Sequence, residues 1–127
     1  MTVLFRPHPF ERDKVKYSVL PKGVQLDFRP DIYSSLKESR IVISELSTGL
    51  FEAVGLVDKV LLWKTDKSKF AFPEIPFLSF STLDELELIL NDNGSFEQES
   101  SAVQWDELWE PNWRQNYLRF VERVIGP

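Results

Sequence analysis

The sequence predicts an α/β domain of the Rossmann-like type, a three-layer sandwich with a mainly parallel sheet of about five strands. Strand-like and helix-like segments alternate along the chain, which is typical of a parallel sheet covered by helices. The apolar runs at residues 41–43 and 60–63 are typical of strands that are buried on both faces. The length of 127 residues, 43% of them hydrophobic, suits one core, so we expect a single domain over residues 1–127.

Five segments are expected to be strands, because apolar and β-branched residues alternate or cluster in them. They are residues 2–5, 24–28, 41–43, 59–63 and 77–80. Pro7 and Pro9 end the first strand, since proline has no N–H group for a ladder. Pro21-Lys22-Gly23 forms a turn before the second strand, because proline and glycine supply the dihedral angles of tight turns.

Five segments are expected to be helical, from apolar residues that recur at intervals of three and four. They are residues 10–20 (loosely helical), 31–39, 49–56, 83–90 and 111–125. Pro30 suits the start of the second helix. Ser47 or Thr48 is expected to cap the third helix and Ser81 or Thr82 the fourth, since their oxygens can accept from the free amides of a first turn.

Two segments are expected to be irregular. Residues 66–76 are polar and then proline-rich, and residues 91–104 read as a flexible polar connection with a turn at Asn93-Gly94. The helix after this connection has an apolar face, which we expect to pack on the domain's own sheet, with a partner or second domain as the alternative. Its residues are Trp113, Tyr117, Phe120 and Val124, with Trp105 and Trp109 before them.

Composition excludes several classes of function. The chain has no cysteine and one histidine, which excludes disulfides, zinc thiolates and multi-histidine metal sites, so we expect no metal and no cofactor. The net charge of −5 argues against general binding to nucleic acid. Apolar runs are too short to span a bilayer and no signal peptide is evident, so we expect a cytoplasmic protein without a transmembrane segment, with peripheral membrane association through partners left open.

The segment Ser44-Glu45-Leu46-Ser47-Thr48-Gly49 links a predicted strand to a predicted helix, at the edge where parallel sheets bind ligands. Ser47 and Thr48 could donate to phosphate oxygens, and Gly49 would allow close approach. Glu52, one turn further, could accept from ribose hydroxyls. An ordinary helix cap explains the same residues, and without further observations it is the simpler interpretation.

His8 lies between two prolines at the end of the first predicted strand. It is either a strand-end histidine bonded to backbone or a donor to an anion, held by prolines that reduce the entropy lost on binding. Arg6 is either a phosphate clamp or, more simply, a charge in solvent. We predict that His8 and the Ser47-Thr48 pair share one edge of the sheet, which favours a phosphate site there.

Two stretches of this sequence carry a resemblance to a known family. "FRPHP" and "DIYSSLKESRIVISELSTGLFEAVGL" resemble the carboxyl-terminal, donor-binding half of bacterial GT-B glycosyltransferases, nearest to CDP-glycerol glycerophosphotransferases and capsule polysaccharide or polysialic acid transferases. The resemblance covers about residues 3–64. The matching residues are His8, Pro9, Asp31, Ile32, Leu36, Ser39, Ser47, Thr48, Phe51, Glu52 and Ala53.

The resemblance implies half of a GT-B fold and a role in bacterial surface polysaccharide synthesis. It implies that His8, Ser47 and Thr48 contact the phosphates of a nucleotide-activated sugar or CDP-alditol donor, with Glu52 near the sugar. His8 is then expected to act as the catalytic group, a protonated donor to the leaving phosphate. GT-B enzymes have two Rossmann-like domains and this chain has one. An amino-terminal domain or partner subunit would therefore complete the enzyme.

A non-catalytic interaction domain of degenerate glycosyltransferase ancestry is the alternative, with the late aromatic helix docking to a partner. A receiver-like regulator is set aside, since the first strand ends in Arg-Pro-His-Pro and not in an acidic cluster. No residue is nominated as general base. Asp31, Glu45 and Glu52 lie near the predicted edge, but solvation or capping explains each of them.

Overall fold

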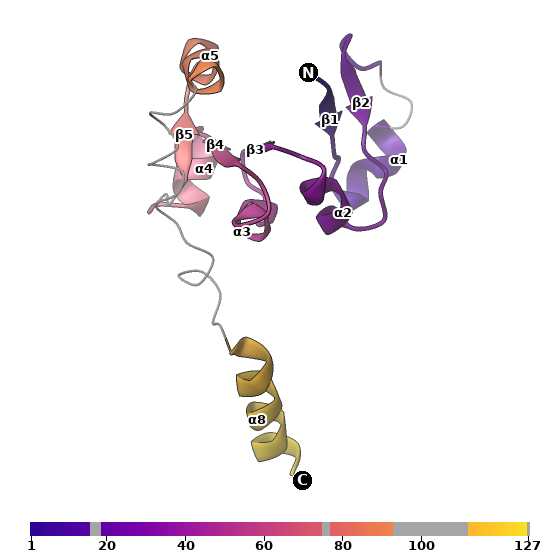
Figure 1. Cartoon of the computed structure of the whole chain (residues 1–127), viewed down its shortest axis with the longest axis vertical. Coiled ribbons are helices and arrows are strands. Elements are labelled where there is room, and N and C mark those ends of the chain that lie inside the picture. The colour runs from indigo at the N-terminus through magenta and orange to yellow at the C-terminus, as the bar shows by residue number, and fades with distance from the viewer. Residues whose placement is uncertain (16–18, 75–76, 93–111, 127) are drawn as a thin grey trace.

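Five strands form two parallel sheets in the computed structural model, which describes residues 1–15, 19–74, 77–92 and 112–126. β1 (Val3–Phe5) pairs with β2 (Val24–Leu26). β3 (Ile41–Ser44), β4 (Lys59–Trp63) and β5 (Leu78–Phe80) form the second sheet, in that order. The predicted α/β class with parallel strands is confirmed. The strands are divided between two sheets where one sheet was expected, because β1 and β3 do not pair (Figure 1).

Helices alternate with the strands, as the sequence predicts. They are η1 (Pro9–Glu11), α1 (Arg12–Val15), α2 (Ile32–Lys37), α3 (Gly49–Ala53), α4 (Asp66–Ala71), α5 (Leu83–Asn91) and α8 (Trp113–Ile125). The turn at residues 21–23 is confirmed: the Val24 N–H donates to the Pro21 carbonyl and Gly23 has a φ of +88°. That positive φ favours glycine, which has no Cβ to clash.

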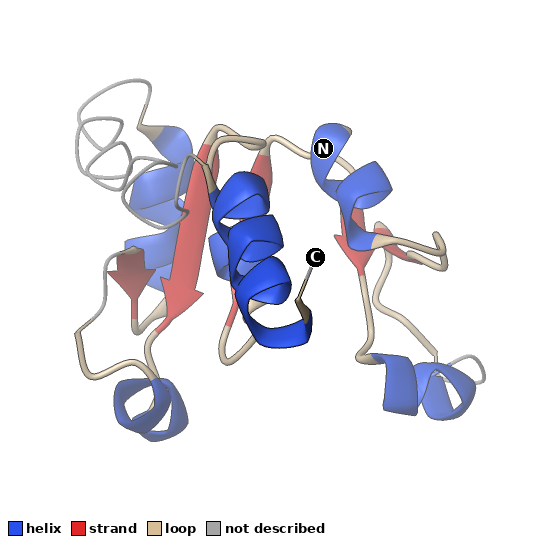
Figure 2. Cartoon of the chain, turned by 90° about the horizontal axis from the view of Figure 1, so that it is seen from below, coloured by secondary structure: helices blue, strands red, loops and turns tan. Residues whose placement is uncertain are grey.

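The larger sheet is covered on both faces (Figure 2). One core cluster contains Leu62 of β4 with Leu50 and Ala53 of α3 and Leu36 of α2. The second contains Leu61 and Phe80 with Ile89 of α5. Leu61 and Leu62 are adjacent and both fully buried, which is the pattern of a central strand between two helical layers.

Two neighbouring strands are less buried than expected. Ile43 and Trp63 are 46% and 47% exposed, so the expectation that these apolar strands are buried throughout is wrong at their carboxyl ends. Both residues lie two positions from side chains that touch the α5 side, Ile41 and Leu61. Because α5 is a single helix of nine residues, it leaves this end of the face open.

The prediction of a loop over residues 66–76 is wrong at its start, where α4 forms. Thr65 and Ser68 make a reciprocal capping box, in which each side chain accepts from the other's backbone N–H. These bonds satisfy amides that a helix start otherwise leaves free, and Asp66 in the first turn suits the helix dipole. Residues 75 and 76, part of the same predicted loop, lie outside the described residues.

Two predicted helices are shorter in the structure. The segment predicted as loosely helical at residues 10–20 contains only η1 and α1 before residues 16–18, which are not described. The helix predicted over residues 49–56 ends at Ala53, and Gly55 has a φ of +83°. Such a positive φ is typical of glycine just after a helix end.

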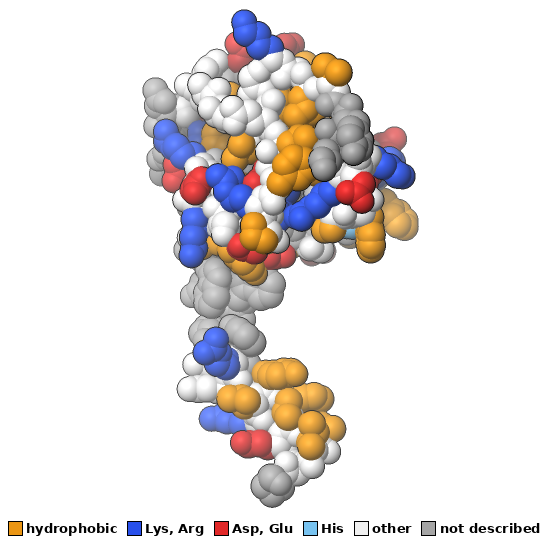
Figure 3. Space-filling model, turned by 90° about the vertical axis from the view of Figure 1, so that its right-hand side faces the viewer, with side chains coloured by type: hydrophobic (Ala, Val, Ile, Leu, Met, Phe, Trp, Pro, Cys, Tyr) orange, Lys and Arg blue, Asp and Glu red, His pale blue; other side chains and the backbone are white. Residues whose placement is uncertain are grey.

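α8 is the expected carboxyl-terminal helix, but its apolar face is not packed on the sheet. Tyr117, Phe120 and Val124 are 60%, 61% and 67% exposed, so the expectation that Tyr117 and Phe120 are buried there is not met (Figure 3). The side chain of Trp113 and the predicted connection after residue 92 lie outside the described part of the chain. No described helix has the length and apolar character that crossing a membrane requires.

Candidate functional site

A cavity of about 700 Å³ extends between the two sheets toward the carboxyl ends of their strands. Its polar lining includes residues at four strand ends: Arg6 after β1, Asp27 after β2, Ser44 at the end of β3 with Glu45, and Ser81 and Thr82 after β5. Ser35, Ser39 and Ser47 complete it. Of the predicted site residues, Arg6, Ser47 and Gly49 line this cavity. His8, Thr48 and Glu52 are not among its lining residues.

Ser47 is the hydroxyl that caps α3. Its Oγ accepts from the Gly49 N–H at 3.0 Å, whereas Thr48, at the cap position itself, makes no capping bond with its side chain. The Ser47 N–H donates to the Ser44 Oγ at 3.2 Å. Since Ser47 Oγ acts as acceptor in the cap, its own O–H proton is available to an acceptor in the cavity.

Gly49 is required by packing. A Cβ at this position would lie 2.9 Å from Ile32 Cδ1 and 3.0 Å from Ser47 Oγ, closer than carbon and oxygen atoms normally approach. Gly49 is buried, and its small size lets α3 pack closely against α2 and lets the Ser47 hydroxyl reach the backbone. The sequence reasoning assigned Gly49 to ligand approach; in the structure it also serves the packing of these two helices.

Glu52 is turned toward α2. A hydrogen bond with Glu52, together with its negative charge, raises the pKa of the exposed Tyr33 phenol. The carboxylate therefore already has a partner on the neighbouring helix. This contact shows why Glu52 is absent from the cavity lining although it follows Gly49 by only three residues.

His8 is exposed and fixed by its own backbone surroundings. Its Nδ1 accepts from the Phe10 N–H at 3.3 Å, and its ring packs on the Phe10 ring with centroids 5.2 Å apart. Because Nδ1 accepts, the neutral ring carries its proton on Nε2. Nε2–H is then the group that can donate to an anion, whereas protonation of Nδ1 would remove the acceptor that caps η1.

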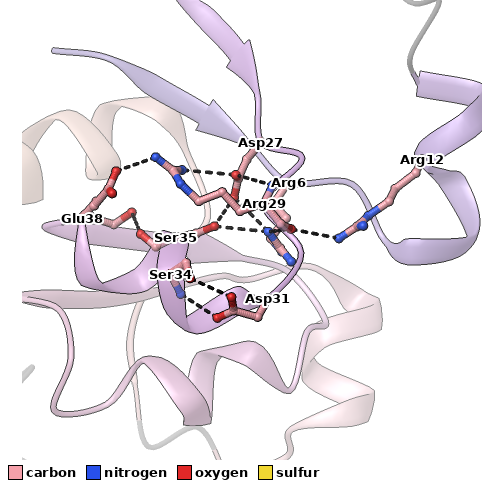
Figure 4. A network of polar contacts seen from close by, with 9 residues as sticks. Arg6, Arg12, Asp27, Arg29, Asp31, Ser34, Ser35 and Glu38 are labelled. Atoms are coloured by element: carbon pink, nitrogen blue, oxygen red, sulfur yellow. Dashed lines mark hydrogen bonds and ion pairs between the residues drawn. The ribbon is translucent and has the colours of Figure 1, made fainter.

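Arg6 is not a lone charge in solvent, because its guanidinium is bonded through Nη1. Its Nη1 lies 3.0 Å from Asp27 Oδ2, 3.1 Å from the Arg29 carbonyl and 3.2 Å from Ser35 Oγ. Asp27 also accepts from Ser35 and from the side chain and backbone N–H of Arg29 (Figure 4). Together these bonds join the ends of β1 and β2 to α2.

Asp27 is the centre of this cluster and was missed by the sequence reasoning. It is 3% exposed, and burial alone would raise its pKa. Hydrogen bonds from Ser35, the Arg29 N–H and Arg6, with the positive charge of Arg6, outweigh burial and hold the pKa of Asp27 below its usual range. The alternation of residues 24–28 places Asp27 on the polar side of a strand. The strand instead ends at Leu26, and the chain turns Asp27 inward.

Glu45 is held at the cavity by Thr65, the N-cap residue of α4. Thr65 Oγ1 donates to Glu45 Oε1 at 2.6 Å, so the cap of α4 also orients this carboxylate. The charge of Glu45 repels an anion but suits the hydroxyls of a sugar. Among the described residues no group of three or more acidic or histidine side chains could hold a metal ion.

Comparison of this α/β domain with family models, curated proteins and solved structures finds no match. What defines the candidate site is therefore its geometry: a cavity at the carboxyl ends of parallel strands, with hydroxyls, a guanidinium and the carboxylates of Asp27 and Glu45 on its wall. In open parallel sheets this edge is where ligands bind.

Proposed function

We propose that this domain binds the diphosphate of a nucleotide-activated donor, as the donor-binding half of a glycosyltransferase or glycerophosphotransferase of bacterial surface polysaccharide synthesis. The observation that carries the proposal is the cavity between the sheets, whose polar wall includes residues at the carboxyl ends of β1, β2, β3 and β5. A volume of about 700 Å³ is within the range of pockets for small molecules. The resemblance of residues 3–64 to GT-B donor domains supports the same class of ligand.

The proposed phosphate contacts are hydroxyl and imidazole donors. Ser47 donates its free O–H from the cavity wall, and His8 donates Nε2–H from the end of the β1 segment. Arg6 contributes positive charge while it remains bonded to Asp27. Glu45 suits a hydroxyl of the donor's sugar or alditol. In this role His8 stabilises the leaving phosphate through its Nε2–H, since its Nδ1 is used as an acceptor.

Catalysis also requires an acceptor site and a general base, and we assign neither to this domain. Both would come from an amino-terminal domain or a partner subunit, as in the two-domain architecture of GT-B enzymes. The protein would then act at the cytoplasmic side of the membrane, where nucleotide-activated donors are used. In this proposal the domain is the carboxyl-terminal half of a GT-B fold.

The test is an amide-shift titration with CDP, CMP and UDP. We expect shifts at Ser44, Ser47 and His8, larger with the diphosphates than with CMP. Ser47→Ala should weaken binding at least fivefold, and the neighbouring Thr48→Val, whose side chain is outside the cavity wall, should leave affinity unchanged. Absence of shifts at millimolar CDP and UDP would refute donor binding.

A non-catalytic interaction domain is the second candidate, favoured by the exposed apolar face of α8. Under this alternative no nucleotide shifts the amides around the cavity. Substituting Phe120→Ser would then disrupt association with a partner, while the stability of the sheets stays the same because Phe120 is outside both core clusters.

A further inference from the structure

Two strand edges face each other without being paired. β1 pairs with β2 and β3 pairs with β4, and Figure 1 shows the free sides of β1 and β3 turned toward each other. The Val3 N–H donates to the Gly23 carbonyl and the Phe5 carbonyl accepts from the Asp27 N–H. Because successive residues of a strand direct their backbone groups to opposite sides, Leu4 directs its N–H and carbonyl into the gap. Such free edges are templates for another strand.

On β3 the residues whose backbone groups face the gap are Ile41 and Ile43. The Arg40 carbonyl accepts from the Lys59 N–H at 3.1 Å, so Arg40 is directed toward β4. Residues 41 and 43 alternate with it and direct their backbone groups into the gap. The gap thus has hydrogen-bonding groups of Leu4 on one side and of Ile41 and Ile43 on the other.

The order of the strands indicates that one strand belongs between them. Across the molecule the order is β2, β1, gap, β3, β4, β5. Doubly wound sheets have the order 3-2-1-4-5-6, in which the central strand has a neighbour on each side. With one strand in the gap, β2 and β1 correspond to strands 3 and 2 of that order, and β3, β4 and β5 correspond to strands 4, 5 and 6. The added strand then takes the place of the central strand 1. Every existing pairing is parallel, so the added strand would be parallel too.

The side chains that line the gap show what chemistry the added strand needs. Leu4, Phe5, Ile41 and Ile43 all line the cavity between the sheets, and Leu4, Phe5 and Ile43 are more than a third exposed. A strand between two others in a parallel sheet is typically apolar over its whole length. The occupant is therefore expected to be rich in valine, isoleucine and leucine.

We propose that the gap between β1 and β3 receives an extended apolar segment of a partner polypeptide, which adds as a parallel strand and joins the two sheets into one. This is strand addition, in which the backbone ladder provides affinity and apolar side chains provide specificity. The added strand would cover the apolar part of the cavity. Its carboxyl end would lie near Arg6 and Ser44, so the polar wall would be the part of the cavity left to a nucleotide.

The test supplies a strand and measures amide hydrogen exchange without nucleotide. The probe is a copy of residues 39–45, fused ahead of Met1 through a Gly/Ser linker of about 15 residues, whose mean reach of roughly 20 Å is comparable to the length of the probe strand. We expect exchange at the Leu4 and Ile43 amides to slow at least tenfold relative to the same fusion with a probe of equal length made of Gly and Ser.

Two variants control for an indirect effect. Leu4→Pro removes the N–H that faces the gap but none that bonds β2, so the protection at Ile43 should be lost while β3, β4 and β5 keep their own exchange rates. Leu4→Ala retains the N–H and should retain the protection. Unchanged exchange at both amides in the fusion would overturn the proposal. Protection that instead appears in the unfused chain and rises with its concentration would also overturn it, in favour of a second copy.

Discussion

Substitution of Asp27 by asparagine tests whether the buried cluster holds the smaller sheet to α2. The change keeps the size of the side chain and removes its charge. In the folded protein the carboxylate accepts from Ser35, from the Arg6 guanidinium and from both the side chain and the N–H of Arg29. In Asp27→Asn two of the acceptor positions become an NH₂ group, which faces donors.

The expected loss follows from burial. Breaking a fully buried ion pair costs about 3–5 kcal/mol, and a hydrogen bond to a charged group contributes about 1.5–3 kcal/mol. The side chains of Arg6 and Arg29 are 23% and 33% exposed, so water can solvate them after the substitution. We therefore expect a decrease of about 2–3 kcal/mol in the free energy of unfolding.

Urea denaturation followed by circular dichroism measures this change. With an m-value of about 1–3 kcal/mol/M, the midpoint should fall by about 1–2 M. Asp58→Asn is the matched control, because its pair with Arg40 is exposed on both sides and should contribute less than about 1 kcal/mol. If Asp27→Asn is no more destabilising than Asp58→Asn, the cluster does not hold the fold as we infer.

The difference in stability between the wild type and Asp27→Asn is expected to depend on pH. The pKa of Asp27 is lowered in the folded state, so its contribution to stability is present above the ordinary aspartate pKa of about 3.9 and is lost as the pH falls through the lowered value. The difference in stability between wild type and Asp27→Asn should therefore be constant near neutral pH and should shrink in acid. A difference that grows in acid would contradict the assigned cause.

Three further outcomes follow from local contacts. Gly49→Ala should destabilise the protein by about 1 kcal/mol, because overpacking against Ile32 Cδ1 exceeds the gain in helix propensity. Ile32→Val removes that atom, so the double variant should recover most of the loss when stability is measured by thermal unfolding. Thr65→Ala should cost about 1–2 kcal/mol in urea denaturation, since it removes the cap of α4; Thr65→Ser, which keeps the hydroxyl, should cost much less. Glu52→Gln should lower the pKa of Tyr33 in an ultraviolet titration, because the hydrogen bond with the carboxylate and its negative charge, which together raise that pKa, are both lost; an unchanged titration would show that Glu52 is not the cause.

The sequence predicted those parts of the fold that local signals determine. The α5 helix begins as expected because Thr82 caps it and Glu85 lies in its first turn, and both effects act within four residues. The strand at residues 59–63 was predicted by its apolar run. α4 was missed because its capping box uses Ser68 where the usual pattern has Glu or Gln, and because a helix of six residues has little periodicity.

What could not be predicted depends on contacts between distant segments. Arg6 and Asp27 are 21 residues apart, and no local pattern indicates that they pair. The exposure of Ile43 and Trp63 depends on how much of one sheet face α5 covers, which is a property of the assembled layers. For the candidate site, Arg6, Ser47 and Gly49 line one cavity, whereas His8 and Thr48, which were predicted at the same edge, are not among its lining residues. The partner of Glu52 on α2 was not foreseen, because it depends on how two helices pack.

The small size of the β1–β2 sheet has a consequence for local unfolding. Two strands of three residues, joined to α2 by the cluster around Asp27, form a weaker cooperative unit than β3, β4 and β5, which pack against helices in both core clusters. This unit should open with a lower free energy than the rest of the domain. A ligand that contacts both units must first order the weaker one, so its measured affinity includes that entropic cost. Whatever binds across the two sheets also acts as the clamp between them.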